Sequence, residues 1–154
     1  MLAEYRRWWL PTLISTLVLV VDQVSKRWIL DMLGPVPLVR SIPLAGDWLN
    51  IVYSRNTGMA FGLLPNMSSL LTVLALCIVA GAIYVYSTQL PNRLIVVQVS
   101  LGLIVGGALG NVVDRIALGY VVDFIQVGWW PVFNIADSAV TVGAILLAVF
   151  LLFV

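Results

Sequence analysis

Carboxylates and carboxamides stand at the ends of apolar segments in the second half of the chain, where they could do chemistry. They are Asn111, Asp114, Asp123, Asn134 and Asp137. Ionisable side chains at membrane depth cost about 2.5–3.5 kcal/mol each on insertion scales, so their default interpretation is functional. Two carboxylates that share one proton can activate a water and polarise a carbonyl, as in aspartic proteases. The same acids could also relay protons through a transporter or channel.

Asp123 and Asp137 form one candidate pair. If the apolar segments on either side of Asp123 pack together, both acids can face one pocket. Burial of Asp123 in an apolar piece should raise its pKa, and two close carboxylates do not both ionise readily. Spacing alone leaves Asp114 a credible rival. Asp137 also falls in the first turn of its segment, where the helix dipole stabilises a carboxylate, and Asn134 could be a plain N-cap.

The composition leaves few other catalytic options. The chain has no histidine and one cysteine, Cys77, which lies inside an apolar segment. Zinc sites of the Cys/His type, Ser-His-Asp chemistry and an intrachain disulfide are therefore excluded. A net charge of +1 without a basic run argues against a nucleic-acid partner. We expect chemistry carried by carboxylates, Lys26 or arginines, with no metal and no cofactor.

The elements that must position these residues are apolar helices. With 62% hydrophobic and 10% charged residues in 154, the chain cannot bury its apolar surface in one small core and belongs in a bilayer. Four segments approach the ~20 residues that cross ~30 Å of hydrocarbon. They lie at about 8–30, 68–87, 94–114 and 134–154. The first is interpreted as a retained helix rather than a removed leader.

Between the first two helices lies the one long polar stretch, at about 35–62. Residues 37–42 and 48–54 have strand character, with a turn at 45–47. We predict a single-domain, all-α membrane protein over 1–154, with four transmembrane helices, a small extracytoplasmic antiparallel β-sheet and a short interfacial segment before the last helix. The six tryptophans fall near predicted helix ends, as in interfacial belts. Counting lysines and arginines does not establish the orientation.

Two further patterns predict helix packing. Asp22 and Lys26 are four residues apart, so on a helix they share a face and can pair. A structural ion pair is the favoured interpretation, with a direct catalytic role as the alternative. Small residues at four-residue intervals let membrane helices approach closely, and they occur at Gly102, Gly106 and Gly110.

Four sequence blocks resemble those of the lipoprotein signal peptidases, the bacterial signal peptidase II family. They are Asp22-Gln23-Val24-Ser25-Lys26, Asn56-Thr57-Gly58-Met59-Ala60-Phe61, residues 106–125, and Phe133-Asn134-Ile135-Ala136-Asp137-Ser138. The blocks follow the family's order and spacing over almost the whole chain. The one departure is Met59, where the family pattern has a small residue.

The resemblance implies a four-helix inner-membrane aspartyl endopeptidase. Such enzymes remove the signal peptide from prolipoproteins that carry diacylglycerol on the lipobox cysteine, by cutting the amide before that cysteine. By motif position Asp123 and Asp137 are the catalytic pair. The supporting or substrate-binding residues are Asp22, Lys26, Asn56, Gly58, Asn111, Asp114, Arg115, Phe133, Asn134 and Ala136.

The resemblance also implies cytoplasmic termini and an active site near the outer membrane face. We expect a monomer whose partners are the lipidated prolipoprotein substrate and membrane lipid. A small proton-coupled transporter or channel is the alternative, and it would spread its acids along the bilayer depth. A non-enzymatic scaffold is a third hypothesis, and it would tolerate Asp-to-Asn changes.

Overall fold

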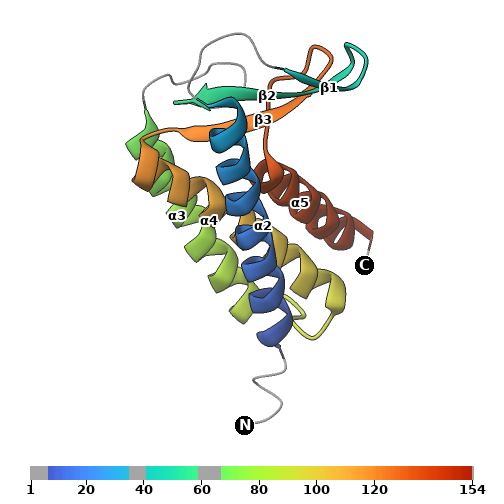
Figure 1. Cartoon of the computed structure of the whole chain (residues 1–154). Helices are drawn as coiled ribbons and strands as arrows, with labels where there is room; N and C mark the ends of the chain where they lie inside the picture. The colour runs from blue at the N-terminus through green and yellow to red at the C-terminus, as the bar shows by residue number, and fades with distance from the viewer. Residues whose placement is uncertain (1–6, 35–40, 59–66, 154) are drawn as a thin grey trace.

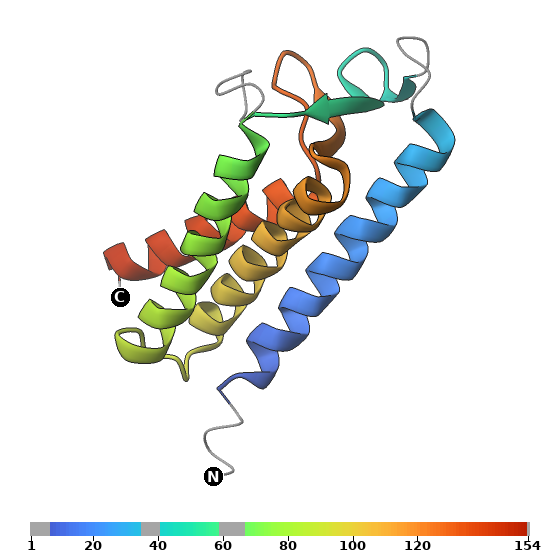
Figure 2. The ribbon, with the colours of Figure 1, turned by 90° about the vertical axis from the view of Figure 1, so that its left-hand side faces the viewer.

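The computed structural model describes residues 7–34, 41–58 and 67–153. Its helices are α2 (Trp9–Leu33), α3 (Ser68–Thr88), α4 (Ile95–Leu118) and α5 (Ile135–Phe153). Its strands are β1 (Ile42–Ala45), β2 (Leu49–Asn56) and β3 (Val121–Val127). The sheet covers one end of the helix bundle, and the α3–α4 connection lies at the opposite end (Figures 1 and 2).

The four predicted helices are all present, and three of those described are long and apolar enough to cross a membrane: α3, α4 and α5. The longest, α2 with 25 residues, is not in that group, because Asp22 and Lys26 interrupt its apolar sequence. The helix α4 continues about one turn past its predicted end at 114. It stops where Gly119 adopts a left-handed φ of 81° and donates its N–H to Arg115 O, a common helix C-terminus.

The helix α4 is the centre of the bundle and packs against α2, α3 and α5. A Cβ on Gly106 would lie 2.7 Å from the backbone oxygen of Ser15 in α2, and one on Gly102 would lie 3.0 Å from Pro11 O. The predicted glycine seam is therefore confirmed as the contact with α2. The sequence pattern did not identify Gly107, which packs directly on the Ala136 carbonyl at the start of α5.

This close packing predicts that Gly106→Ala destabilises the protein by about 1–3 kcal/mol, the usual result of overpacking. The matched control is Gly81→Ala in α3, where a Cβ would meet nothing within 4 Å. The control should be neutral or stabilising, because alanine is about 1 kcal/mol better than glycine inside a helix. Thermal unfolding of the purified variants in detergent measures both. Equal melting temperatures for the two variants would show that the seam is not tight.

The strands form an antiparallel sheet in the order β1-β2-β3. The turn predicted at 45–47 is confirmed, with Gly46 at a φ of 55°. The predicted strand at 48–54 corresponds to β2, whereas residues 37–40 of the other predicted strand lie outside the described residues, as do Met59 to Phe61 of the second sequence block.

The prediction was incomplete for the segment before the last helix. It was expected only as a short interfacial piece, but it forms β3 and pairs with β2, with Asp123 opposite Ser54. Side chains alternate along a strand. Val122 and Phe124 pack into a core with Ile29 and Leu33 of α2, so Asp123 between them is directed to the other face of β3.

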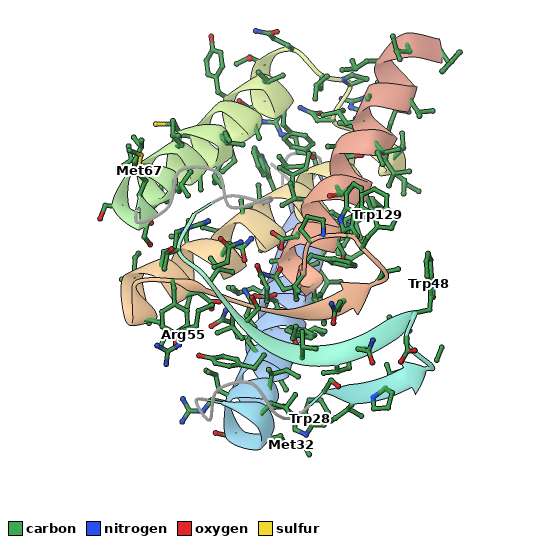
Figure 3. All side chains as sticks on the ribbon, turned by 90° about the horizontal axis from the view of Figure 1, so that it is seen from above. Trp28, Met32, Trp48, Arg55, Met67 and Trp129 are labelled. Carbon is green, nitrogen blue, oxygen red and sulfur yellow. The ribbon has the colours of Figure 1, made fainter. Side chains whose placement is uncertain are left out.

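The tryptophans lie near the ends of helices and strands, as the sequence predicts. Trp48 and Trp129 lie on neighbouring turns at one corner of the sheet, and Arg55 lies at the far side (Figure 3). The turns are joined by a hydrogen bond of 2.7 Å from Gly128 N–H to Trp48 O. Both indoles are exposed, and their placement in an interfacial belt remains a prediction.

Candidate active site

The start of α5 is organised by a reciprocal pair of hydrogen bonds. The Asn134 side-chain oxygen accepts the Asp137 backbone N–H at 2.8 Å, and the Asp137 Oδ2 accepts the Asn134 backbone N–H at 3.2 Å. This arrangement is a capping box, with Asn134 as the N-cap. The alternative that Asn134 caps this helix is therefore confirmed, although capping is only part of what its side chain does.

Asn134 links the two candidate acids. Its Nδ2 donates to Asp123 Oδ1 at 2.7 Å, while its backbone N–H donates to Asp137 Oδ2 at 3.2 Å. The two segments are held together by Phe133, whose N–H donates to Ile125 O at 3.1 Å and whose carbonyl accepts the Ile125 N–H at 2.8 Å. These bonds bring β3 and the first turn of α5 side by side, and thus Asp123 near Asp137.

Each acid is also held by a second carboxamide. Asn56 donates to Asp123 Oδ2 at 2.8 Å, and Asn111 donates to Asp137 Oδ1 at 2.7 Å. A carboxylate oxygen can accept two hydrogen bonds, so Asp123 and Asp137 each retain a position for water or substrate. Asp123 is 2% exposed, whereas Asp137 is only partly buried. Access to the pair is therefore greater at Asp137.

The electrostatics of the pair favour one bound proton. Burial raises the pKa of Asp123 to about 7, and repulsion from Asp137 acts in the same direction, while hydrogen bonds from Asn56 and Asn134 act against it. The direction of this pKa shift is the one expected from an acid in an apolar strand. Asp123 is thus poised to hold a proton near neutral pH while lying beside a second carboxyl group.

Behind the pair lies a buried ion cluster. The Lys26 ammonium contacts Asp22 Oδ2 at 2.8 Å, Asp114 Oδ2 at 3.0 Å and Asn111 Oδ1 at 3.0 Å, which matches its three protons. Lys26 is 2% exposed and Asp22 is fully buried. The predicted Asp22–Lys26 pair is confirmed. Lys26 from α2 is thus the cation that binds Asp114.

The two acids of this cluster hold the segments that carry the candidate pair. Asp22 Oδ1 accepts the Ala136 N–H of α5 at 3.0 Å, and Asp114 Oδ2 accepts the Val122 N–H of β3 at 3.0 Å. Because Asp114 binds Lys26, Gln23 and this backbone N–H, it has little capacity left for a substrate. The contacts favour a positioning role for Asp114 over the rival role of reacting acid.

Sequence reasoning assigned no role to Gln23. Its Nε2 lies 2.9 Å from Asp114 Oδ1, 3.2 Å from Asp22 Oδ2 and 3.2 Å from Gly110 O, so it ties α2 to α4. A Cβ on Gly110 would lie 2.5 Å from Asp22 Oδ2, so the glycine seam must extend to Gly110 for Asp22 to fit against α4. The sequence feature that could have identified Gln23 is its position, as a carboxamide between Asp22 and Lys26 on an apolar helix.

Gly58 and Arg115 lie at the edge of the hydrogen-bond network around the two acids. The Gly58 N–H donates to Asn56 Oδ1 at 3.0 Å, which turns the Asn56 NH₂ toward Asp123. Arg115 is half-buried and its Nη2 lies 3.5 Å from Gly58 O, while its Nε has no hydrogen-bond partner among the described residues. Eleven of the twelve candidate residues predicted from the sequence are thus in one connected network, and the twelfth, Phe133, bonds to the backbone of β3 beside it. Their roles in catalysis remain a proposal.

The fold and this network define a class: a helical membrane protein with neighbouring carboxyl groups on β3 and in the first turn of α5. A family model described as signal peptidase (SPase) II matches residues 14–153. The chain is 43% identical to the lipoprotein signal peptidase of Syntrophomonas wolfei over 136 residues, which cover 88% of each chain. It is 42% identical to that of Caulobacter vibrioides over 150 residues, which cover 92% of this chain and 86% of the relative.

The chain is also similar in fold and sequence to solved structures of bacterial membrane enzymes. A bacterial membrane enzyme determined by the in meso method at 2.3 Å has a TM-score of 0.81 and 35% identity, covering 92% of this chain and 87% of that one. A second, at 1.9 Å, has a TM-score of 0.80 and 34% identity, covering 93% and 92%. The chain therefore belongs to the signal peptidase II family, and the resemblance of the four sequence blocks is confirmed. The family and the apolar helices together indicate a bacterial membrane protein.

Proposed function

We propose that the protein is an intramembrane aspartyl endopeptidase that removes the signal peptide from diacylglyceryl-modified prolipoproteins, with Asp123 and Asp137 as its catalytic pair. The observation that carries this proposal is Asn134, whose side-chain NH₂ donates to the Asp123 carboxyl group and whose backbone N–H donates to the Asp137 carboxyl group, while the family match supplies the reaction class. The relatives are named lipoprotein signal peptidases, and the bond cut is the amide before the lipidated cysteine.

In the proposed mechanism Asp123 holds the shared proton and Asp137 acts as the base. Asp137 is the more accessible acid, so a water beside it can lose a proton to its carboxylate while the water oxygen attacks the scissile carbonyl. The proton on Asp123 is donated to the carbonyl oxygen, which stabilises the tetrahedral intermediate. When the C–N bond breaks, the proton taken by Asp137 passes to the leaving amine, and the intermediate returns its proton to Asp123.

We also propose that α2 is a fourth membrane span, with both chain termini cytoplasmic and the sheet at the outer face. The charges that interrupt α2, Asp22 and Lys26, are buried and paired inside the protein, so lipid does not meet them. Its exposed charges, Arg27 and Asp31, lie in its last two turns next to the sheet. A lipidated substrate then reaches the acid pair by lateral diffusion near the interface.

The transporter or channel alternative fits the acids less well. Among the described residues, Asp114, Asp123 and Asp137 are all near the sheet end of the bundle, and no acid lies on α5 beyond its first turn or on the first half of α4. A proton relay needs acids spread through the bilayer depth. The clustering supports hydrolysis at one membrane face.

The proposed reaction is tested with the purified protein and two forms of one prolipoprotein, with and without diacylglycerol on the lipobox cysteine. We expect cleavage of the lipidated form, and mass spectrometry of the product should place the new N-terminus at that cysteine. Failure to cut the lipidated form would refute the peptidase assignment. Equal cleavage of both forms would refute the lipid requirement.

The pH dependence of cleavage follows from the raised pKa of Asp123. Because its proton is needed, kcat/KM should fall as the pH rises through about 7. In Asn56→Ala the fall in kcat/KM should occur at higher pH, because the lost hydrogen bond from Asn56 favoured the charged form of Asp123. Initial rates across neutral pH measure both midpoints. A wild-type rate that stays constant above neutrality would contradict the assigned proton.

A further inference from the structure

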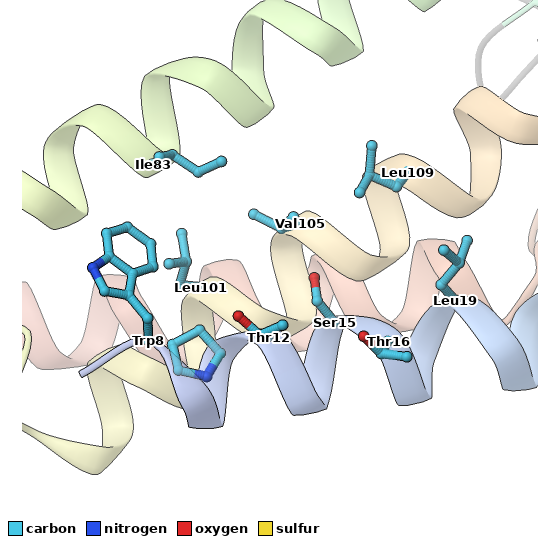
Figure 4. Close-up of a pocket in the computed structure, with 10 residues that line it drawn as sticks. Trp8, Thr12, Ser15, Thr16, Leu19, Ile83, Leu101, Val105 and Leu109 are labelled. Atoms are coloured by element: carbon cyan, nitrogen blue, oxygen red, sulfur yellow. The ribbon is translucent and has the colours of Figure 1, made fainter. Parts of the chain in front are cut away.

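A groove separates α2 from α3 on the membrane-spanning part of the bundle. It has a volume of about 280 Å³ and is lined by side chains of α2, α3 and α4. Residues that mark its extent are Trp8, Ser15, Leu19, Ile83, Leu101 and Leu109 (Figure 4). On α4 these residues belong to a different face from Gly102, Gly106 and Gly110, which contact α2. The groove is therefore separate from the acid network.

The groove has a fixed lower end because α2 and α3 are joined there. Pro11 has no N–H, so the carbonyl of Arg7 one turn earlier is not used within the helix. The Tyr86 hydroxyl of α3 donates to that carbonyl, and the Trp8 and Tyr86 rings lie 4.9 Å apart, edge to face. Above this contact the two helices diverge along α4 (Figure 2).

The length of the groove matches one leaflet. Trp8 and Leu19 are eleven residues apart on α2, which at 1.5 Å per residue is about 16 Å. The hydrocarbon core of a bilayer is ~30 Å thick, so the groove spans about half of it, starting from a tryptophan at the end of a helix. A straight apolar chain from one leaflet has this depth and would lie along the groove.

The charged side chains that the structure describes at this end are two arginines. Arg7 precedes Trp8, and Arg93 lies in the α3–α4 connection at the same end of the bundle. The acids of the described residues are elsewhere, in the upper part of α2, at the sheet, or at the sheet ends of α4 and α5: Asp22, Asp31, Asp47, Asp114, Asp123 and Asp137. A phosphate held at the membrane boundary would lie near two guanidinium groups.

We propose that this groove binds one acyl chain of an anionic phospholipid whose phosphate lies beside Arg7 and Arg93. The site rests on α2 lying in the membrane with α3 and α4, and it does not depend on the peptidase activity. The lipid would fill the gap between α2 and α3 and stabilise their separation at the end remote from the acid pair.

Ser15 offers a way to close the groove without changing charge. Its hydroxyl points into the groove (Figure 4) and has no hydrogen-bond partner among the described residues. Ser15→Leu therefore replaces empty space with an apolar side chain, and Val105→Phe does the same from α4. The matched control is Val20→Leu, on the same helix but at an exposed position.

The test is native mass spectrometry of the full chain in detergent, titrated with phosphatidylglycerol or phosphatidylcholine that carry the same acyl chains. We expect the wild type and Val20→Leu to retain one phosphatidylglycerol at least tenfold more strongly than one phosphatidylcholine. Ser15→Leu and Val105→Phe should each lose that bound lipid, and the Arg7→Gln/Arg93→Gln variant should lose the preference between headgroups. Unchanged retention in both groove variants, or equal retention of the two lipids by the wild type, would overturn the proposal.

Discussion

Asp123→Asn and Asp137→Asn should each lower kcat/KM for lipidated prolipoprotein by at least about 10²–10⁴-fold, the usual contribution of acid–base catalysis. An amide at 137 cannot take a proton from water, and an amide at 123 has no acidic proton to give. The single-site rates are compared with those of Asp114→Asn, whose side chain faces Lys26 and Gln23 instead of the open side of the network. A near wild-type rate in either catalytic variant would show that the pair is misassigned.

Stability separates the reacting acids from the supporting one. The folded-state pKa of Asp123 is about 7, above its ordinary value of 3.8. Between these two pH values the unfolded chain releases this proton and the folded protein keeps it, so folding stability falls as the pH rises from about 4 to about 7. Asparagine avoids this burial penalty but loses a hydrogen bond. At neutral pH the free energy of unfolding of Asp123→Asn should therefore lie within about 1–2 kcal/mol of the wild-type value. Asp114→Asn removes a partner of buried Lys26 and should be clearly less stable.

Lys26→Met should be the most destabilising single change in the network. It leaves Asp22 and Asp114 buried without their cation, and breaking a buried ion pair typically costs about 3–5 kcal/mol. It also removes the ammonium that holds Asn111, which donates to Asp137, so cleavage should fall with stability. Denaturant or thermal unfolding in detergent, combined with the cleavage assay, measures both effects.

The same helix offers a matched control in Arg27→Gln. Arg27 and Asp31 are also four residues apart, but they are 80% and 70% exposed and separated by 3.9 Å. Exposed pairs of this kind contribute about 0–1 kcal/mol. If Lys26→Met were as mild as Arg27→Gln, the buried cluster would not be the element that holds β3 and α5 together.

The helices could be predicted from the sequence because their apolar length is a local property. The strand β3 could not, because residues 121–127 are short and apolar, and a strand is distinguished from an interfacial piece only by its partner. That partner is β2, which lies about 65 residues earlier in the chain, with Ser54 opposite Asp123. Pairing at such a distance leaves no local signal.

The candidate site was predictable in residue type but not in its connections. Spacing on one helix predicted the Asp22–Lys26 pair. The contact between Lys26 and Asp114 depends instead on how closely α2 approaches α4, which Gly106 and Gly110 permit. For the same reason, the sequence could not show that a lysine from another helix pairs with Asp114.

The most direct test of the proposed catalytic pair is infrared absorption by protonated carboxyl groups as the pH is raised through neutrality, in the wild type and in Asp123→Asn and Asp114→Asn. The expected result is a carboxyl band that disappears with a midpoint near pH 7 in the wild type and in Asp114→Asn, and is missing in Asp123→Asn. A band that persists unchanged in Asp123→Asn, or a wild type without any carboxyl titrating near neutrality, would contradict a proton held between Asp123 and Asp137.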